Sequence, residues 1–115
     1  MPARGYYIKI VEHDGGYMFQ MWYIAKQEMG YSQRYNTKKE CLIGVETFKK
    51  YLREISPTEE NGLAKVKQLD NGKFVYEIYS QDGDVLYYSR NIQTKYNCRK
   101  SLRKTCEKFG DAEIR

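Results

Sequence analysis

The sequence of 115 residues has few cysteines and no long apolar run, and so lacks the features typical of disulfide-bonded, secreted or membrane proteins. Its three cysteines are odd in number and none is closely spaced with another, which argues against a disulfide framework. No apolar run approaches the length that spans a bilayer, and the first residues lack the apolar stretch of a signal peptide. We therefore expect a cytoplasmic protein that has no membrane partner.

Signatures of catalysis and of metal binding are also missing. The sequence contains no Gly-rich phosphate loop, no zinc signature and no Ser/His/Asp order. His13, the single histidine, stands beside Asp14 and could share a proton with it, but no nucleophile or second histidine completes a constellation. A solvated turn is the better interpretation of this pair. We expect no catalytic residue, no cofactor and no metal ion, and an enzyme is only the third-ranked interpretation.

Tyrosine is abundant, and much of the sequence is present twice. Twelve tyrosines fit a sheet with one partly exposed face, because tyrosine favours strands and tolerates a wet boundary. Residues 5–52 align without a gap on residues 62–109 at a shift of 57 positions. Seven residues are identical in the two halves: Gly5/Gly62, Gly15/Gly72, Tyr31/Tyr88, Ser32/Ser89, Thr37/Thr94, Lys38/Lys95 and Cys41/Cys98. Each half alone would be a marginal folding unit, so we expect one domain, 1–115, in which repeat 1 (5–56) and repeat 2 (62–110) share a core.

Each repeat has the pattern of three strands followed by a helix. β-Branched and aromatic runs separated by Asp-Gly or Asn-Gly turns predict strands at 6–12, 17–24, 28–33, 63–68, 74–80 and 85–90. A helix is predicted after Thr37, with Glu40 three places on as a capping box, and a second helix after Thr94. The first helix should end near Ser56, because a proline follows, and the second should end at Gly110.

Hydrophobic spacing assigns the faces of these elements. The helices carry apolar stripes at spacings i, i+4, i+7 and i+11: Cys41, Val45, Phe48 and Leu52 in the first, and Cys98, Leu102, Thr105 and Phe109 in the second. We expect both helices to cover the sheet face that contains Phe19 and Ile78. The other face has Gln20 and Glu77 at its centre, and a charge is a poor choice for a core. Buried cysteine behaves as a small hydrophobe, whereas Cys106 lies off the stripe and should be the most reactive thiol.

The first strands of the two repeats differ in phase. At the shift of 57, Ile8 falls on Lys65. Ala64 and Val66, the apolar residues of the second repeat, are one position out of phase with the apolar residues of the first strand. A slip of one residue reverses every side chain of a strand, so we infer a bulge or an unequal first turn in one repeat. Together these patterns predict an α+β fold of two β-β-β-α repeats with pseudo-twofold symmetry, in which an antiparallel sheet carries two helices on one face.

Three short segments resemble the YegP-like family of small, mainly bacterial proteins: Tyr35-Asn36-Thr37-Lys38, Gly44-Val45-Glu46 and Phe48-Lys49-Lys50. Members of this family contain one or two copies of a strand-rich motif that ends in a helix, and the resemblance covers nearly the whole chain. It departs at Ala25-Lys26, where the family has an Asn-Gly turn, and at Ile92 and Ser101, where the family has a tyrosine and a glycine. The resemblance implies two β-β-β-α units related by a pseudo-twofold axis, with single-copy members pairing as dimers, and it transfers no enzymatic activity.

Two predicted surface features bear on function. The second helix carries a basic stripe, a possible nucleic-acid contact: Arg99, Lys100, Arg103 and Lys104. The uncovered sheet face carries four apolar side chains, a possible interface for a homodimer or for a protein or ligand partner: Met18, Trp22, Val75 and Tyr79. We therefore predict a small non-enzymatic interaction or accessory protein of unassigned function. A nucleic-acid-binding module that uses the basic helix is the alternative, although the net charge is only +5.

Overall fold

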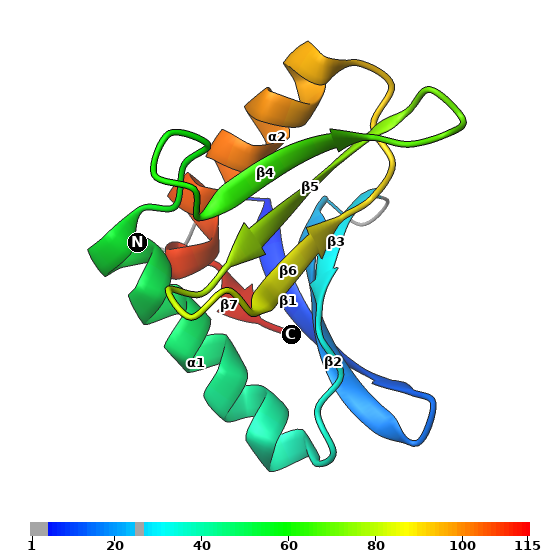
Figure 1. Ribbon diagram of the computed structural model, residues 1–115. Helices are drawn as coiled ribbons and strands as arrows, with labels where there is room; N and C mark the ends of the chain where they lie inside the picture. The colour runs from blue at the N-terminus through cyan, green and yellow to red at the C-terminus, as the bar shows by residue number, and fades with distance from the viewer. Residues whose placement is uncertain (1–4, 25–26) are drawn as a thin grey trace.

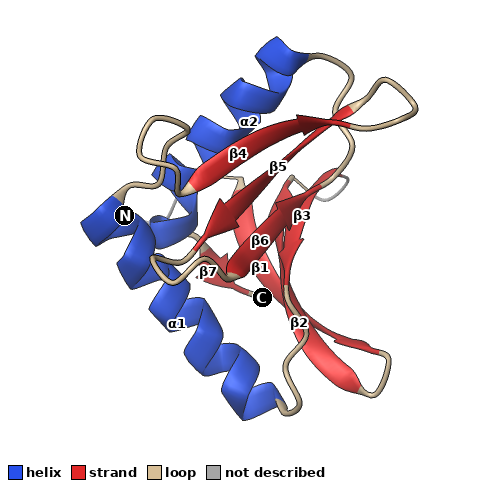
Figure 2. Cartoon of the chain, viewed as in Figure 1, coloured by secondary structure: helices blue, strands red, loops and turns tan. Residues whose placement is uncertain are grey.

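The structure, a computed structural model that describes residues 5–24 and 27–115, has two layers. One is a seven-stranded sheet, and the other consists of two helices that lie on one face of the sheet (Figures 1 and 2). The strands are β1 (Tyr6–His13), β2 (Gly16–Tyr23), β3 (Gln27–Ser32), β4 (Ala64–Gln68), β5 (Phe74–Tyr79), β6 (Val85–Ser89) and β7 (Glu113–Ile114). The helices are α1 (Lys38–Ile55), α2 (Lys95–Lys108) and the short 3-10 helix η1 (Phe109–Asp111). The predicted α+β fold is confirmed, and the Ala25-Lys26 departure lies outside the described residues.

The order of strands in the sheet is β4-β5-β6-β3-β2-β1-β7. Strands β1 to β6 pair antiparallel, as predicted. The two halves of the sheet join through β3 and β6, where Tyr31 pairs with Tyr88. The edge strand β7 is an addition to the prediction, and it pairs parallel with β1 through Tyr7 and Glu113. A two-residue strand is too short to show an alternating pattern in the sequence.

The first hairpins of the two halves differ in the length of their loops. In the β1–β2 turn, Asp14 and Gly15 have positive φ values of 49° and 76°, as in a two-residue type I′ turn. In the β4–β5 turn, the backbone N–H of Leu69 donates to the carbonyl of Lys73 at 2.7 Å, which closes a three-residue loop that ends in Gly72. The predicted unequal first turn is therefore present, and it accounts for the difference in phase between β1 and β4.

Both long helices begin at the predicted threonine. Thr37 Oγ1 accepts from the backbone N–H of Glu40 at 3.1 Å, and Thr94 Oγ1 accepts from that of Asn97 at 3.1 Å. Each bond satisfies an amide donor that has no partner within the first turn of the helix. Helix α1 ends at Ile55, near Ser56 as predicted, and the φ of 53° at Ser56 takes the chain out of the helical conformation.

The core lies between the helices and the predicted face of the sheet. Each helix buries one stripe: Cys41, Val45, Phe48 and Leu52 on α1, and Cys98, Leu102 and Thr105 on α2. The sheet residues buried beneath them include Phe19, Met21, Tyr76 and Ile78. Phe109 of η1 completes the cluster, with its ring centroid 4.8 Å from that of Phe48 and 5.5 Å from that of Phe19. Because aromatic side chains bury large areas, this cluster joins both helices to the sheet.

Two buried serines hold the centre of the sheet together. Ser32 Oγ accepts from the backbone N–H of Phe19 at 2.9 Å, and Ser89 Oγ accepts from that of Tyr76 at 2.8 Å. In both places the regular ladder between neighbouring strands ends one pair before the serine. The hydroxyl oxygen therefore replaces a backbone acceptor, because a buried amide needs a partner. This role explains why serine occupies both positions.

Candidate functional site

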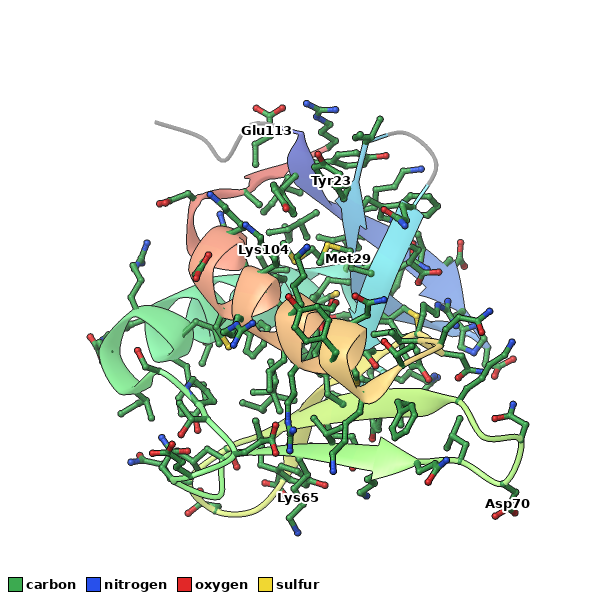
Figure 3. All side chains as sticks on the ribbon, turned by 90° about the horizontal axis from the view of Figure 1, so that it is seen from above. Tyr23, Met29, Lys65, Asp70, Lys104 and Glu113 are labelled. Atoms are coloured by element: carbon green, nitrogen blue, oxygen red, sulfur yellow. The ribbon has the colours of Figure 1, made fainter. Side chains whose placement is uncertain are left out.

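The sheet face opposite the helices carries a continuous row of side chains across six strands. The strand register places these residues side by side from β1 to β4: Lys9, Gln20, Tyr31, Tyr88, Glu77 and Lys65. We call this row, with its neighbours on the same side of the strands, the open face. Helices α1 and α2 both pack on the opposite side (Figure 2). Figure 3 shows Lys65 pointing away from β4 on the side opposite α2.

Two half-buried tyrosines stand at the centre of the open face. The rings of Tyr31 and Tyr88 are stacked, with centroids 5.4 Å apart and planes 19° apart. The guanidinium of Arg90 lies 4.6 Å from the Tyr31 centroid, and it donates two hydrogen bonds of 2.8 and 2.7 Å to Glu28. The site prediction missed this pair, although the identity of the two tyrosines in the repeat was an available signal.

The four side chains predicted as a possible interface are all half-buried on the open face, but in two separate places. Met18 and Trp22 are on β2, whereas Val75 and Tyr79 are on β5. Strands β3 and β6 lie between them, so the central tyrosine pair separates the two groups. The predicted residues therefore mark the two sides of a longer surface and do not form one patch by themselves.

A lysine lies over an aromatic ring on each side of the open face. Lys9 Nζ is 5.1 Å from the centroid of Trp22, and Lys65 Nζ is 5.3 Å from the centroid of Tyr79. Trp22 Nε1 also donates to Gln20 Oε1 at 3.0 Å. A cation is attracted to the negative face of an aromatic ring. The open face thus combines aromatic area with positive charge.

Six charged side chains of this surface together carry a net charge of +2: Lys9, Lys65, Lys67, Arg90, Glu28 and Glu77. Lys67 Nζ lies 2.6 Å from Glu77 Oε1, and Arg90 Nη2 lies 2.6 Å from Glu28 Oε2. Burial raises the pKa of Glu77, but hydrogen bonds, first that from Lys67, outweigh burial and leave this pKa below its ordinary value. Glu77 is therefore held as an anion by Lys67, Glu28 is paired with Arg90, and the lysines at the ends of the row supply the excess positive charge.

The basic stripe predicted on the second helix lies on the other side of the molecule from the open face. Of its members, Lys100 and Arg103 are exposed on α2, and Lys104 is partly buried. Arg99 donates to both carboxylate oxygens of Glu59, at 2.8 and 3.2 Å, and this bond lowers the pKa of Glu59. The sheet therefore separates the basic helix from the aromatic residues of the open face.

Other chemically notable groups lie apart from the open face. His13 Nε2 lies 3.3 Å from Asp14 Oδ2 at the β1–β2 turn, and both side chains are exposed, in agreement with the solvated-turn interpretation. Cys106 borders a hollow of about 350 Å³ between α2 and the loop before β4, and burial raises the pKa of its thiol to about 11. Cys41 and Cys98 are fully buried on the helix stripes, and burial raises their pKa values to about 11 as well.

The described part of the chain contains neither a cluster of metal ligands nor a membrane-spanning helix. Within residues 5–24 and 27–115, His, Cys, Asp and Glu side chains form no group of three or more that could hold a metal ion. None of the helices in the same ranges is long and apolar enough to cross a membrane.

Comparison with known proteins identifies the fold. No family profile matches the chain, and no curated protein matches its sequence. Similar solved structures include a UPF0339 protein from Shewanella oneidensis, with a TM-score of 0.78 and 10% identity over 96% of this chain and 90% of that one. Another is yegP, a protein of unknown function from E. coli, with a TM-score of 0.77 and 12% identity over 100% of this chain and 93% of that one. The chain therefore has the YegP-like fold that the sequence resemblance implies.

Proposed function

Starting from this YegP-like fold, we propose that the protein is a small non-enzymatic interaction module that binds its partner on the open face. The proposal rests on one observation, the aromatic and aliphatic side chains of the open face that both helices leave uncovered. An apolar surface edged by polar groups is typical of binding sites. All three cysteines are free thiols, which supports a reducing, cytoplasmic location for this activity.

The proposed occupant of the open face is a second copy of the chain or another protein or ligand. Trp22 is the single tryptophan, so its fluorescence reports directly on this surface. Sedimentation velocity over a range of protein concentrations, combined with iodide quenching of Trp22, tests self-association. If the occupant is a second copy, a dimer forms at high concentration and Trp22 is protected from iodide in it. A monomer at every concentration, with Trp22 fully quenched, contradicts self-association.

Charge-introducing variants locate the contact. Met18→Glu and Val75→Glu each place a carboxylate on one side of the open face, and each should convert the dimer to a monomer. Ile43→Glu is the matched control, because Ile43 is 58% exposed on α1, away from this face. A dimer that survives both open-face variants, or is lost equally in the control, assigns the contact to another surface.

The second candidate is a nucleic-acid-binding module that uses α2. It is supported by the exposure of Lys100 and Arg103 and by Tyr96, whose side chain is 70% exposed on the same helix. An exposed ring beside basic side chains can stack a base while the cations contact phosphates. Loss of oligonucleotide binding in Lys100→Gln/Arg103→Gln, with binding retained in open-face variants, is the result that this candidate requires.

We also propose that residues 5–56 and 62–110 are two copies of one ancestral unit within a single domain. Irregular backbone features support this, because they recur at the shift of 57. Register shifts occur at Met21/Trp22 and at Ile78/Tyr79, and isolated bridges join Tyr17 to Tyr35 and Phe74 to Ile92. In this proposal the pair Tyr31↔Tyr88 lies on the pseudo-twofold axis.

A further inference from the structure

We infer that the partner of the open face is a single-stranded nucleic acid, an inference that rests on the proposed function because it names the occupant of the same surface. The first argument is charge. Glu28 and Glu77 are each already paired with a cation, and the Arg115–Glu113 pair at the β7 edge is neutral. A second copy would bring an equally positive surface against this one, and like charges in an interface are repulsive. A phosphate backbone has the complementary charge.

The second argument is the arrangement of the aromatic rings. Tyr88 stands at the centre of the row beside Tyr31, whose ring already contacts Tyr88 and Arg90. The half-buried rings of Trp22 and Tyr79 stand on either side of this pair. Antiparallel sheets with exposed aromatic side chains bind single strands by stacking bases on the rings. The row crosses five strand spacings, about 24 Å at about 4.8 Å each, which is long enough for several nucleotides. Because every base has a stacking face, such a surface is tolerant of sequence.

The third argument concerns the cations that lie over the rings. Lys9 and Lys65 cover Trp22 and Tyr79 from exposed positions. An exposed cation–π contact is weaker than the stacking of a base on an aromatic ring. A base can therefore displace the flexible lysine tail, and the released ammonium group remains close enough to contact the neighbouring phosphate. Each lysine and its ring would then hold one nucleotide by its phosphate and its base together.

Fluorescence anisotropy with a short, dye-labelled single-stranded DNA of mixed sequence tests this inference, with the duplex of the same sequence for comparison. We expect the single strand to bind more tightly than the duplex at low salt. If Lys9 and Lys65, the two cations that supply the excess charge, each contact one phosphate, the slope of log K against log salt should be about −1.4, at about 0.7 per contact. Tyr88→Ala should weaken binding by about tenfold or more, since it removes one stacking ring.

Two double variants at exposed positions separate a loss of binding from a loss of folding. Lys9→Gln/Lys65→Gln changes only exposed side chains, and it should reduce the salt slope by about 1.4, which is two contacts. Lys100→Gln/Arg103→Gln on α2 is the matched control and should leave affinity and slope unchanged.

Several results would overturn the inference. The first is a flat titration, in which the anisotropy of the labelled single strand does not change at low salt because no binding occurs. The second is equal binding of single strand and duplex, and the third is binding that depends on α2 and not on the open face. An acidic peptide that binds the open face while DNA does not would assign a different partner. If the protein forms a dimer with Trp22 protected and binds no DNA, this inference fails while the proposed interaction function stands.

Discussion

Replacing Ser32 or Ser89 by alanine should destabilise the protein by similar amounts, although the two residues are in different halves of the chain. Ser32→Ala leaves the buried N–H of Phe19 without the acceptor that now lies at 2.9 Å, and Ser89→Ala does the same to Tyr76 at 2.8 Å. A buried donor that loses its partner costs about 1–3 kcal/mol, so we expect about 2 kcal/mol for each variant. For a chain of this size the melting temperature should fall by about 8 °C.

Urea denaturation measures this cost, and amide hydrogen exchange locates it. With a slope of about 2 kcal/mol per molar urea, each unfolding midpoint should fall by about 1 M, and the amide of Phe19 or Tyr76 should lose protection from exchange. Ser80→Ala is the control, because Ser80 Oγ accepts from the Asp84 N–H in an exposed turn where water can replace it; it should cost less than about 0.5 kcal/mol. A Ser32→Ala variant as stable as the control refutes the hydrogen-bond argument. Costs that differ by more than about 1 kcal/mol between Ser32 and Ser89 refute their equivalence.

Two further predictions concern the strand junction and the thiols. Gly30→Ala should cost about 3 kcal/mol in urea denaturation, because a Cβ there would lie 2.5 Å from the backbone oxygen of Tyr88 and would force β3 away from β6; a loss below about 1 kcal/mol contradicts this. Cys41, Cys98 and Cys106 should react with a thiol reagent at least about a hundredfold more slowly in the folded protein than after unfolding, because burial raises each thiol pKa from 9.0 to about 11 and only the thiolate reacts. Cys41 and Cys98, which have no exposed surface, are also shielded from the reagent itself. The rate should rise as the pH approaches 11, and Cys106, the least buried of the three, should react first; labelling of the folded protein at the unfolded rate is the opposing result.

Much of the local structure could be predicted because its causes lie within a few residues. Thr37 and Thr94 cap helices through amides three positions away, and the apolar stripes follow the helical period. The unequal first turn could be inferred too, since a slip of one residue moves every side chain to the other face of a strand. The candidate site was predicted less completely: Met18, Trp22, Val75 and Tyr79 were placed on the correct face, but the tyrosine pair that separates them was not identified.

Local sequence was enough to predict the type, ends and buried face of most elements, because hydrogen bonding to caps, turn conformations and hydrophobic period are short-range properties. Which strands meet, and therefore which surface is left for a partner, depends on contacts between distant parts of the chain. Glu28 and Arg90 are 62 positions apart and yet share two hydrogen bonds. Helix α2 lies on the opposite side of the sheet from the aromatic rings of the open face (Figure 2). Such contacts depend on how the two halves of the sheet join, and no spacing within either half specifies that junction.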